Sequence, residues 1–156
     1  MTLLIDEAHS GEVPMHLLLL ADPSESRIRS YLADSDCLVA RRGNTVVGAC
    51  VIQRKEQSAY ELMAIATAPE HQRSGVGARL LKQAIARCEE QGASRLEVGT
   101  GSFGYQLRFY QKHGFRVCGI ERDFFLRNYD APIVEDGVLL LDMLRLELSF
   151  TDKPAS

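Results

Sequence analysis

The stretch that decides the fold is Ile65-Ala66-Thr67-Ala68-Pro69-Glu70-His71-Gln72-Arg73-Ser74-Gly75-Val76-Gly77-Ala78. It leaves a strand-like run, turns at Pro69 and enters a helical pattern through Gly75 and Gly77. Glycines at a first turn let another group approach the backbone closely. The first N–H groups of a helix have no internal partner, and the helix dipole places partial positive charge there. The order of strand, glycine-containing turn and helix therefore predicts an anion site suited to a phosphate or pyrophosphate.

Two common phosphate-binding motifs are excluded by the residues that follow the glycines. Gly75 and Gly77 precede Ala78-Arg79-Leu80, so the Gly-Lys-Ser/Thr of a P-loop is absent. The dinucleotide fingerprint G-x-G-x-x-G would need a glycine at position 80, where the chain has leucine. The alternative interpretation is that both glycines only allow close packing of a helix on a sheet.

Outward from this stretch, apolar and polar patterns predict the secondary structure. A helix over 74–91 has its apolar residues at helical period and ends at Gly92. Strands over 37–40, 46–53 and 60–68 form an antiparallel meander with hairpin chemistry at 41–44. A strand over 3–5 and two helices, over 14–20 and following 22–24, precede the meander. A strand over 95–98, expected to pair in parallel with an earlier one, a helix over 104–112 and strands over 115–125 and 138–150 complete the chain. The predicted class is α+β, with a mixed, mostly antiparallel sheet of six to seven strands and about four helices.

Length, composition and charge restrict the class of protein. The 156 residues predict one domain over 1–150, followed by a disordered tail over 151–156. The formal net charge of −3 argues against nucleic-acid binding. The longest uncharged run near the start, 13–21, is about half the ~20 residues of a membrane-spanning helix, and no leader pattern precedes it. The four cysteines lack metal-site spacing, so we expect no metal, reduced thiols and a cytoplasmic protein.

Two motifs in this order resemble those of one enzyme family. The segment Gln72-Arg73-Ser74-Gly75-Val76-Gly77-Ala78 resembles the Q/R-x-x-G-x-G/A signature of the GNAT superfamily of acetyl-CoA-dependent N-acetyltransferases. About 35 residues further on, Phe109-Tyr110-Gln111-Lys112-His113-Gly114-Phe115 resembles the Tyr-x-Lys-x-Gly-Phe stretch of the same family. The resemblance covers roughly 37–117 and points to a small single-domain member of bacterial type with the GNAT fold.

The resemblance implies how acetyl-CoA binds. The backbone of Ile65, Ala66 and Thr67 would pair with the pantetheine arm like an added strand. The backbone N–H groups from Arg73 to Ala78 would cradle the pyrophosphate. The candidate cofactor-binding residues of the loop are Gln72, Arg73, Ser74, Gly75, Val76, Gly77 and Ala78. Many members have an asparagine near the start of the next helix, but this chain has Gly99-Thr100-Gly101-Ser102-Phe103-Gly104 there. Ser102 is the candidate to replace that contact.

Two residues are candidates for proton transfer. Tyr110 matches the family's tyrosine that protonates the leaving thiolate, the alternative being a core tyrosine. Glu61 matches a position used as general base in some members. Alternation predicts that Glu61, Met63, Ile65 and Thr67 share one face of their strand. The alternatives for Glu61 are an exposed carboxylate or one that orients the substrate. His71 and His113, beside the motifs, are interpreted as surface or capping residues.

The acceptor is predicted only by class. Between Asn128 and Gly137 there are three acidic residues and no basic one, which is typical of a solvated loop or of a wall that attracts a cation. We therefore expect acetyl transfer to a primary amine of a small cationic molecule by direct attack in a ternary complex. The alternatives are a protein or peptide amine, and a CoA-binding regulatory module without catalysis. The apolar last strands also suit the edge of a homodimer.

Overall fold

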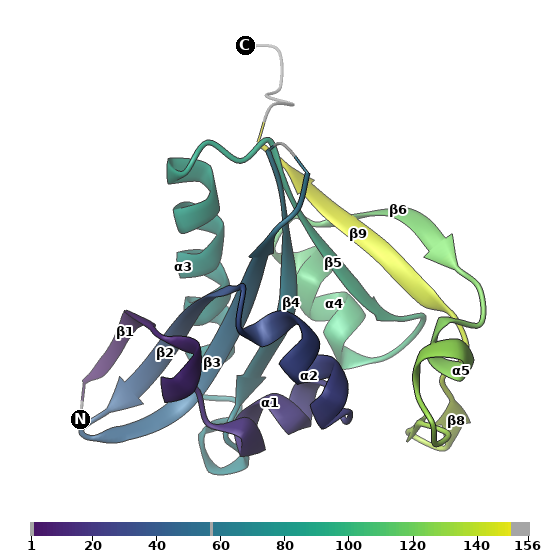
Figure 1. Ribbon diagram of the computed structural model, residues 1–156, viewed down its shortest axis with the longest axis horizontal. Helices are drawn as coiled ribbons and strands as arrows, with labels where there is room; N and C mark the ends of the chain where they lie inside the picture. Colours follow the sequence, from purple (N-terminus) through teal and green to yellow (C-terminus); the bar gives the residue numbers. More distant parts are fainter. Residues whose placement is uncertain (1, 57, 151–156) are drawn as a thin grey trace. The chain divides into compact units, whose positions relative to one another are not determined.

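The computed structural model describes residues 2–56 and 58–150, and its contacts divide the chain into two compact units, Met1–Ser94 and Arg95–Ser156 (Figure 1). The predicted tail over 151–156 lies outside the described residues. The single domain expected over 1–150 stays a prediction.

An antiparallel sheet of four strands organises the first unit. In spatial order these are β1 (Leu3–Ala8), β2 (Asp36–Arg42), β3 (Thr45–Arg54) and β4 (Ala59–Thr67). The predicted meander over 37–68 is confirmed. Its first turn contains Gly43 at φ +60°, a left-handed conformation that glycine adopts at little cost and that suits a tight hairpin.

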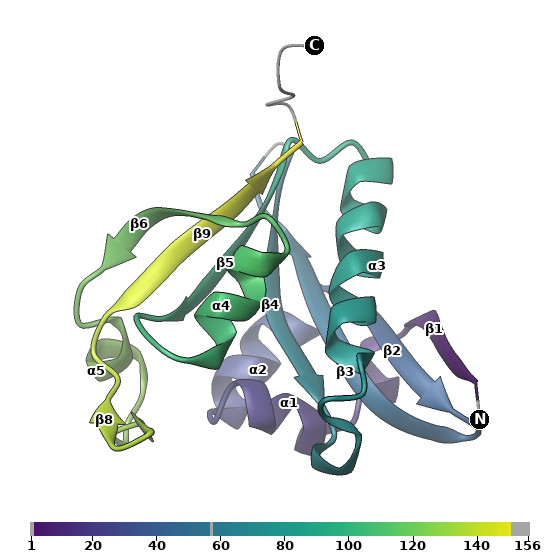
Figure 2. The same ribbon diagram turned by 180° about the vertical axis from the view of Figure 1, so that it is seen from behind.

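Helices cover both faces of this sheet. They are α1 (Met15–Ala21), α2 (Glu25–Leu32) and α3 (Val76–Glu90). Opposite views show α1 and α2 on one face and α3 on the other (Figures 1 and 2). Leu18 of α1 and Ile28 of α2 pack with Val39, Val51 and Ala64 of the strands, and all five are buried. The face beneath α1 and α2 therefore holds a continuous hydrophobic core.

Helix α3 packs closely on the opposite face. Its stripe of buried residues has the period predicted from the sequence: Val76, Leu80, Leu81, Ala84 and Cys88. Gly48 of β3 lies directly beneath the first turns of this helix. A Cβ atom at Gly48 would come within 2.9 Å of both Val76 Cγ1 and Leu80 Cδ1. The absent side chain at Gly48 thus sets how closely the start of α3 approaches the sheet.

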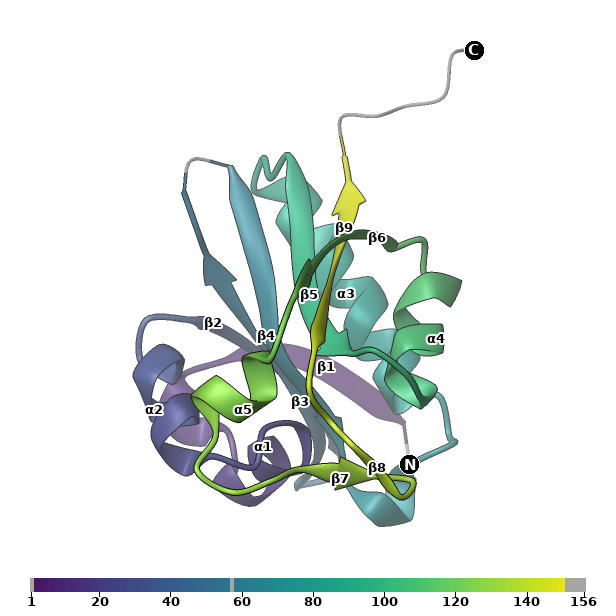
Figure 3. The same cartoon turned by 90° about the vertical axis from the view of Figure 1, so that its right-hand side faces the viewer.

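The second unit is built on an antiparallel sheet of three strands. Strand β9 (Met143–Ser149) lies between β5 (Arg95–Gly101) and β6 (Arg116–Glu121). Two helices, α4 (Tyr105–Lys112) and α5 (Phe124–Asn128), and a small hairpin of β7 (Val134–Glu135) and β8 (Val138–Leu139) complete the unit (Figure 3).

The last two predicted strands are each broken in the structure. The strand expected over 115–125 ends at Glu121, and α5 follows it. Asp123 causes the break, because its backbone is left-handed at φ +59° and its N–H donates to Asp142 Oδ1 at 2.8 Å. The strand expected over 138–150 is interrupted between β8 and β9. Parallel pairing between 60–68 and 95–98 would join the two units, and it stays a prediction.

Substitution of Gly48 tests the close packing of α3. We expect Gly48→Ala to lower the free energy of unfolding by about 1–3 kcal/mol, because the added methyl group overpacks the contact with Val76 and Leu80. Urea denaturation measures this change. Gly11→Ala is the matched control, since a Cβ at Gly11 has no atom within 4 Å. Equal stability of the two variants would contradict the close approach.

Candidate active site

The turn between β4 and α3 is held by its own hydrogen bonds. A short 3-10 helix, η2 (Pro69–His71), follows β4. Gln72 Nε2 donates to the carbonyl of Thr67 at 3.1 Å, and Ser74 Oγ donates to the carbonyl of His71. Arg42 of β2 contacts His71 Nδ1 at 2.9 Å. These bonds fix the path of the backbone between the strand and the helix.

The start of α3 has the geometry of an anion site. Arg73 and Gly75 are both left-handed, at φ +64° and +86°. Residues 72–75 are exposed, and no side chain among the described residues caps the helix. The first turn contains no acidic residue, so the partial positive charge of the helix end is not neutralised there. The N–H groups at this end are available to an anion from solvent.

The backbone around Gly75 leaves room for an anion. A Cβ atom at Gly75 would meet nothing within 4 Å, so the backbone has open space in front of it. Backbone N–H groups near left-handed residues form concave sites for anions. The side chain of Arg73 is exposed beside this position and adds a positive charge. Open space, left-handed backbone and a positive side chain thus occur together within residues 72–78.

Strand β4 corrects one prediction about the site. Val51 of β3 pairs with Ala64 and Ile52 pairs with Leu62, so Met63 is an extra, bulged residue. Because of the bulge, Glu61 lies on the face of the sheet opposite to Ile65, and the prediction that they share one face is wrong. Alternation along the sequence could not reveal the bulge, which arises from the pairing of two strands.

The carboxylate of Glu61 has a basic partner that sequence reasoning missed. Lys55 Nζ lies 3.4 Å from Glu61 Oε1 across the β3–β4 hairpin. The side chain of Glu61 is 14% exposed and that of Lys55 is 40% exposed. An ion pair with such an exposed partner is weak and exchangeable. In the β3–β4 hairpin Gln53 pairs with Glu61, and this register brings Lys55, two residues further along the chain, close to Glu61. Sequence reasoning could have found Lys55 only by assigning this register.

Tyr110 and Ser102 belong to the second unit. Tyr110 is 6% exposed, on α4. Its ring makes edge contacts with Phe109 and Phe115, at centroid distances of 5.4 and 5.7 Å. These contacts hold the ring independently of its hydroxyl. Ser102 is exposed in the turn between β5 and α4. The positions of both residues relative to the α3 loop stay a prediction.

The histidines beside the motifs both contact groups in their own unit. His113 Nδ1 contacts the carbonyl of Phe109 at 2.9 Å at the end of α4, which confirms the predicted capping role. His71 contacts Arg42, as described above.

Burial affects the acidity of the cysteine thiols. Cys37, Cys50 and Cys88 are buried, and burial raises the pKa of these thiols to about 11, 12 and 11. Cys118 is exposed, yet partial burial and the nearby Glu147 raise the pKa of its thiol as well. Because the thiolate is the reactive form, the three buried cysteines are suited to packing.

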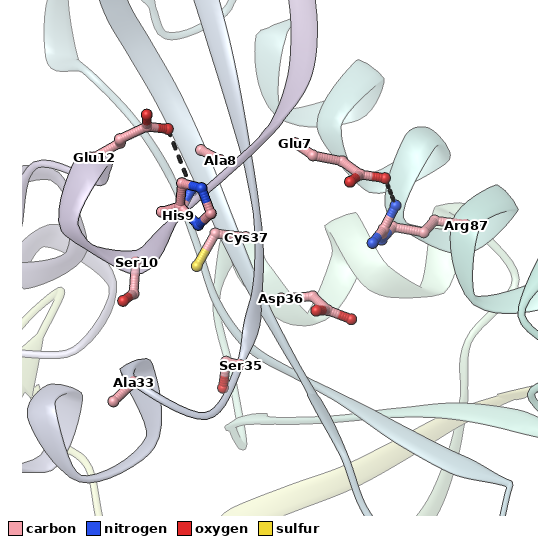
Figure 4. Close-up of a pocket in the computed structure, with 10 residues that line it drawn as sticks. All are labelled: Glu7, Ala8, His9, Ser10, Glu12, Ala33, Ser35, Asp36, Cys37 and Arg87. Carbon is pink, nitrogen blue, oxygen red and sulfur yellow. Dashed lines mark hydrogen bonds and ion pairs between the residues drawn. The ribbon is translucent and has the colours of Figure 1, made fainter.

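A pocket of about 560 Å³ lies elsewhere in the first unit and contains none of the predicted site residues (Figure 4). Its charged lining includes Glu7, Glu12, Asp36 and Arg87. Glu7 pairs with Arg87, and Glu12 accepts a hydrogen bond from the N–H of His9 at 3.1 Å. Of the three carboxylates in the lining, those of Glu7 and Glu12 therefore interact with other residues of the pocket.

The described residues contain neither a metal-binding cluster nor a membrane-spanning helix. Over 2–56 and 58–150, no group of histidine, cysteine and acidic side chains is arranged to hold a metal ion. Within the same ranges, no helix has the length and apolar character needed to cross a membrane.

Comparison with known proteins gives the class and the family of this chain. The profile described as "Acetyltransferase (GNAT) domain" matches residues 33–117. An uncharacterized N-acetyltransferase of Bacillus subtilis, YvbK, is 41% identical over 133 residues, covering 85% of this chain and 86% of the relative. This chain belongs to the GNAT family of acetyltransferases. The predicted enzyme class, an acetyl-CoA-dependent N-acetyltransferase, is confirmed.

Solved structures confirm the predicted fold class. The IAA acetyltransferase from Bacillus cereus matches with a TM-score of 0.91 and 38% identity, covering 96% of this chain and 100% of that chain. A GNAT family acetyltransferase from Elizabethkingia anophelis, crystallised with acetyl-CoA bound, matches with a TM-score of 0.91 and 35% identity, covering 95% and 98%. The chain therefore has the α+β GNAT fold, as the sequence predicts.

A negative charge at the start of α3 tests the anion site. We expect Gly77→Asp to weaken acetyl-CoA binding by about tenfold or more, because the new carboxylate repels the pyrophosphate and competes for the same N–H groups. Isothermal titration calorimetry measures the dissociation constant.

Gly11→Asp is the control, since it adds the same charge at an exposed glycine outside this loop. If folded Gly77→Asp binds acetyl-CoA as tightly as Gly11→Asp does, the start of α3 is not the pyrophosphate site.

Proposed function

We propose that this enzyme transfers the acetyl group of acetyl-CoA to the primary amine of a small cationic molecule, by direct attack in a ternary complex. The observation that carries the proposal is the exposed, uncapped start of α3, built by the GNAT signature at 72–78. The acetyl-CoA bound to the Elizabethkingia anophelis structure supports the same donor substrate for this chain.

The donor contacts follow from the strand, turn and helix. Residues 72–78 bind the pyrophosphate, chiefly through backbone N–H groups. The backbone of Ile65, Ala66 and Thr67, at the end of β4, binds the pantetheine arm like an added strand. Ser102, exposed before α4, supplies the contact for which many relatives use asparagine.

Two side chains carry the proton transfers. The amine nitrogen attacks the thioester carbonyl carbon, and the carbon–sulfur bond then breaks. Tyr110 gives its hydroxyl proton to the departing thiolate, whose ordinary pKa near 8.5 makes this help useful at neutral pH. Glu61 accepts a proton from the amine, directly or through water, and its exchangeable contact with Lys55 is lost in that step.

Direct attack is supported by the state of the thiols. A route through an acetylated cysteine needs an accessible thiolate, whereas the pKa of Cys37, Cys50 and Cys88 lies at about 11 to 12. Cys118 lies on β6, outside both motifs.

A cationic acceptor is supported by the second unit. Asp130, Glu135 and Asp136 are all exposed, and the segment from 128 to 137 contains no basic side chain. Phe125 and Tyr129, which are close to this segment in the sequence, are half-buried. Their rings stack on each other with centroids 6.0 Å apart. Carboxylates and aromatic faces together favour an ammonium group.

The net charge and the free cysteines favour a small-molecule substrate and a cytoplasmic location. Its net charge of −3 disfavours nucleic acid as a partner, and its four cysteines are free, as expected in a reducing compartment.

A panel of amines tests the proposed reaction. Release of free CoA is measured with polyamines, amino acids, aminoglycosides and peptides, at saturating acetyl-CoA. We expect the highest kcat/KM with a small amine that carries a second positive charge, because the acidic segment attracts it.

The triple variant Asp130→Asn, Glu135→Gln, Asp136→Asn should raise KM for that amine and leave KM for a neutral amine unchanged. Higher kcat/KM with peptides would instead indicate a protein acceptor. Binding of acetyl-CoA without CoA release from any amine would indicate a regulatory module.

Removal of one hydroxyl group tests the proposed acid. We expect Tyr110→Phe to lower the single-turnover rate by roughly 10²-fold while KM for acetyl-CoA changes little, the behaviour of an interaction made in the transition state. The unfolding free energy should stay within about 1 kcal/mol, because the ring contacts with Phe109 and Phe115 remain.

Glu61→Gln distinguishes the acid from the base. Its rate loss should be greatest at low pH, where little amine is neutral, whereas the loss in Tyr110→Phe should not depend on the supply of neutral amine. A parental rate in Tyr110→Phe would make this tyrosine a packing residue only.

A further inference from the structure

Strand β6 forms one edge of the sheet in the second unit. It pairs with β9, and no other described strand of this unit pairs with it. An edge strand presents unpaired N–H and C=O groups, which can bind a strand of another chain. Val117 and Ile120 on this edge are 47% and 60% exposed. Such exposure of two large apolar side chains on an unpaired edge is typical of a contact surface.

A bulge brings these two apolar residues to the same face. Residues three apart on a regular strand point to opposite faces. Here Val117 pairs with Leu146 and Ile120 pairs with Leu144, and Cys118 between them has no partner in β9. The extra residue shifts the alternation. Val117 and Ile120 therefore both lie on the face of the sheet that carries their partners Leu146 and Leu144.

The two ends of β6 have opposite charges on the other face. Arg116 pairs in register with Glu147, and Glu121 pairs with Met143. Within residues 2–56 and 58–150, neither Arg116 nor Glu121 makes an ion pair. Each strand therefore has a positive end and a negative end, separated by an apolar pair.

We propose that two copies of this chain associate by antiparallel pairing of their β6 strands. In the proposed register, Arg116 lies opposite Glu121 of the second copy, and Val117 lies opposite Ile120 of the second copy. The two-fold axis passes between Cys118 and Gly119, so every contact occurs twice. Opposite residues in an antiparallel pair must lie on the same face, and this register satisfies that condition at both ends of the strand.

Other registers lose this complementarity. With the second strand moved by one residue in one direction, Arg116 would lie opposite Ile120, and the two point to different faces. Moved by one in the other direction, Val117 would lie opposite Glu121, again on different faces. The sequence of β6 thus favours one register. The contact is short, because β6 contributes only six residues from each copy. We expect a dimer that forms at micromolar concentrations, as small interfaces do.

Charge reversal tests the register, by sedimentation equilibrium over a series of protein concentrations. Arg116→Glu places two glutamates opposite each other at both ends of the paired strands, and Glu121→Arg does the same with two arginines. We expect each single variant to weaken self-association by about tenfold or more. The double variant Arg116→Glu, Glu121→Arg should restore it. An equimolar mixture of the two single variants should also associate, because each of its pairs is then of opposite charge.

Arg108→Glu, on the exposed side of α4, is the control for net charge and should change the dissociation constant less than about twofold. Circular dichroism confirms that each variant is folded. A chain that stays monomeric at high micromolar concentration would overturn the proposal. So would a dimer that responds equally to Arg116→Glu and Arg108→Glu, or single variants that do not associate when mixed.

Discussion

The constraint on which the proposed chemistry depends is the set of unpaired N–H groups at the start of α3. Four such groups occur at the start of any α-helix, and most helices satisfy them with a capping side chain. Here the cap position is Gly75, which has no side chain to offer. The energetic cost of leaving these groups to solvent is small because residues 72–75 are exposed. An anion that binds there replaces water and gains the helix dipole.

Packing keeps that helix end in place. The buried stripe of α3 rests on the sheet along most of its length, and Gly48 lets the first turns approach β3 within contact distance. The hydrogen bonds of Gln72 and Ser74 hold the turn from the other side. A site whose donors are fixed before the ligand arrives loses little conformational entropy on binding. The hydrogen bonds of the turn thus support the proposed acetyl-CoA site by holding its N–H donors in place.

The sequence predicted the helix and the turn well because their signals are local. The expected helix over 74–91 is observed over Val76–Glu90. The agreement is close because helical periodicity and the stop at Gly92 are both visible in the local sequence. What it could not predict arises from pairing between distant segments. The bulge at Met63, which separates Glu61 from Ile65, depends on the register with β3. Helix α5 was hidden in an apolar run, because the bond from Asp123 to Asp142 joins residues far apart in the sequence.

The most direct test of the central claim is hydrogen–deuterium exchange of the backbone amides, with and without acetyl-CoA. The N–H groups of residues 73–78 should exchange more slowly when acetyl-CoA is bound, because a bound pyrophosphate accepts their hydrogen bonds. The amides at the far end of the same helix, near Glu90, should change little. Unchanged exchange over 73–78 at saturating acetyl-CoA would contradict the account, since the donor would then bind elsewhere on the protein.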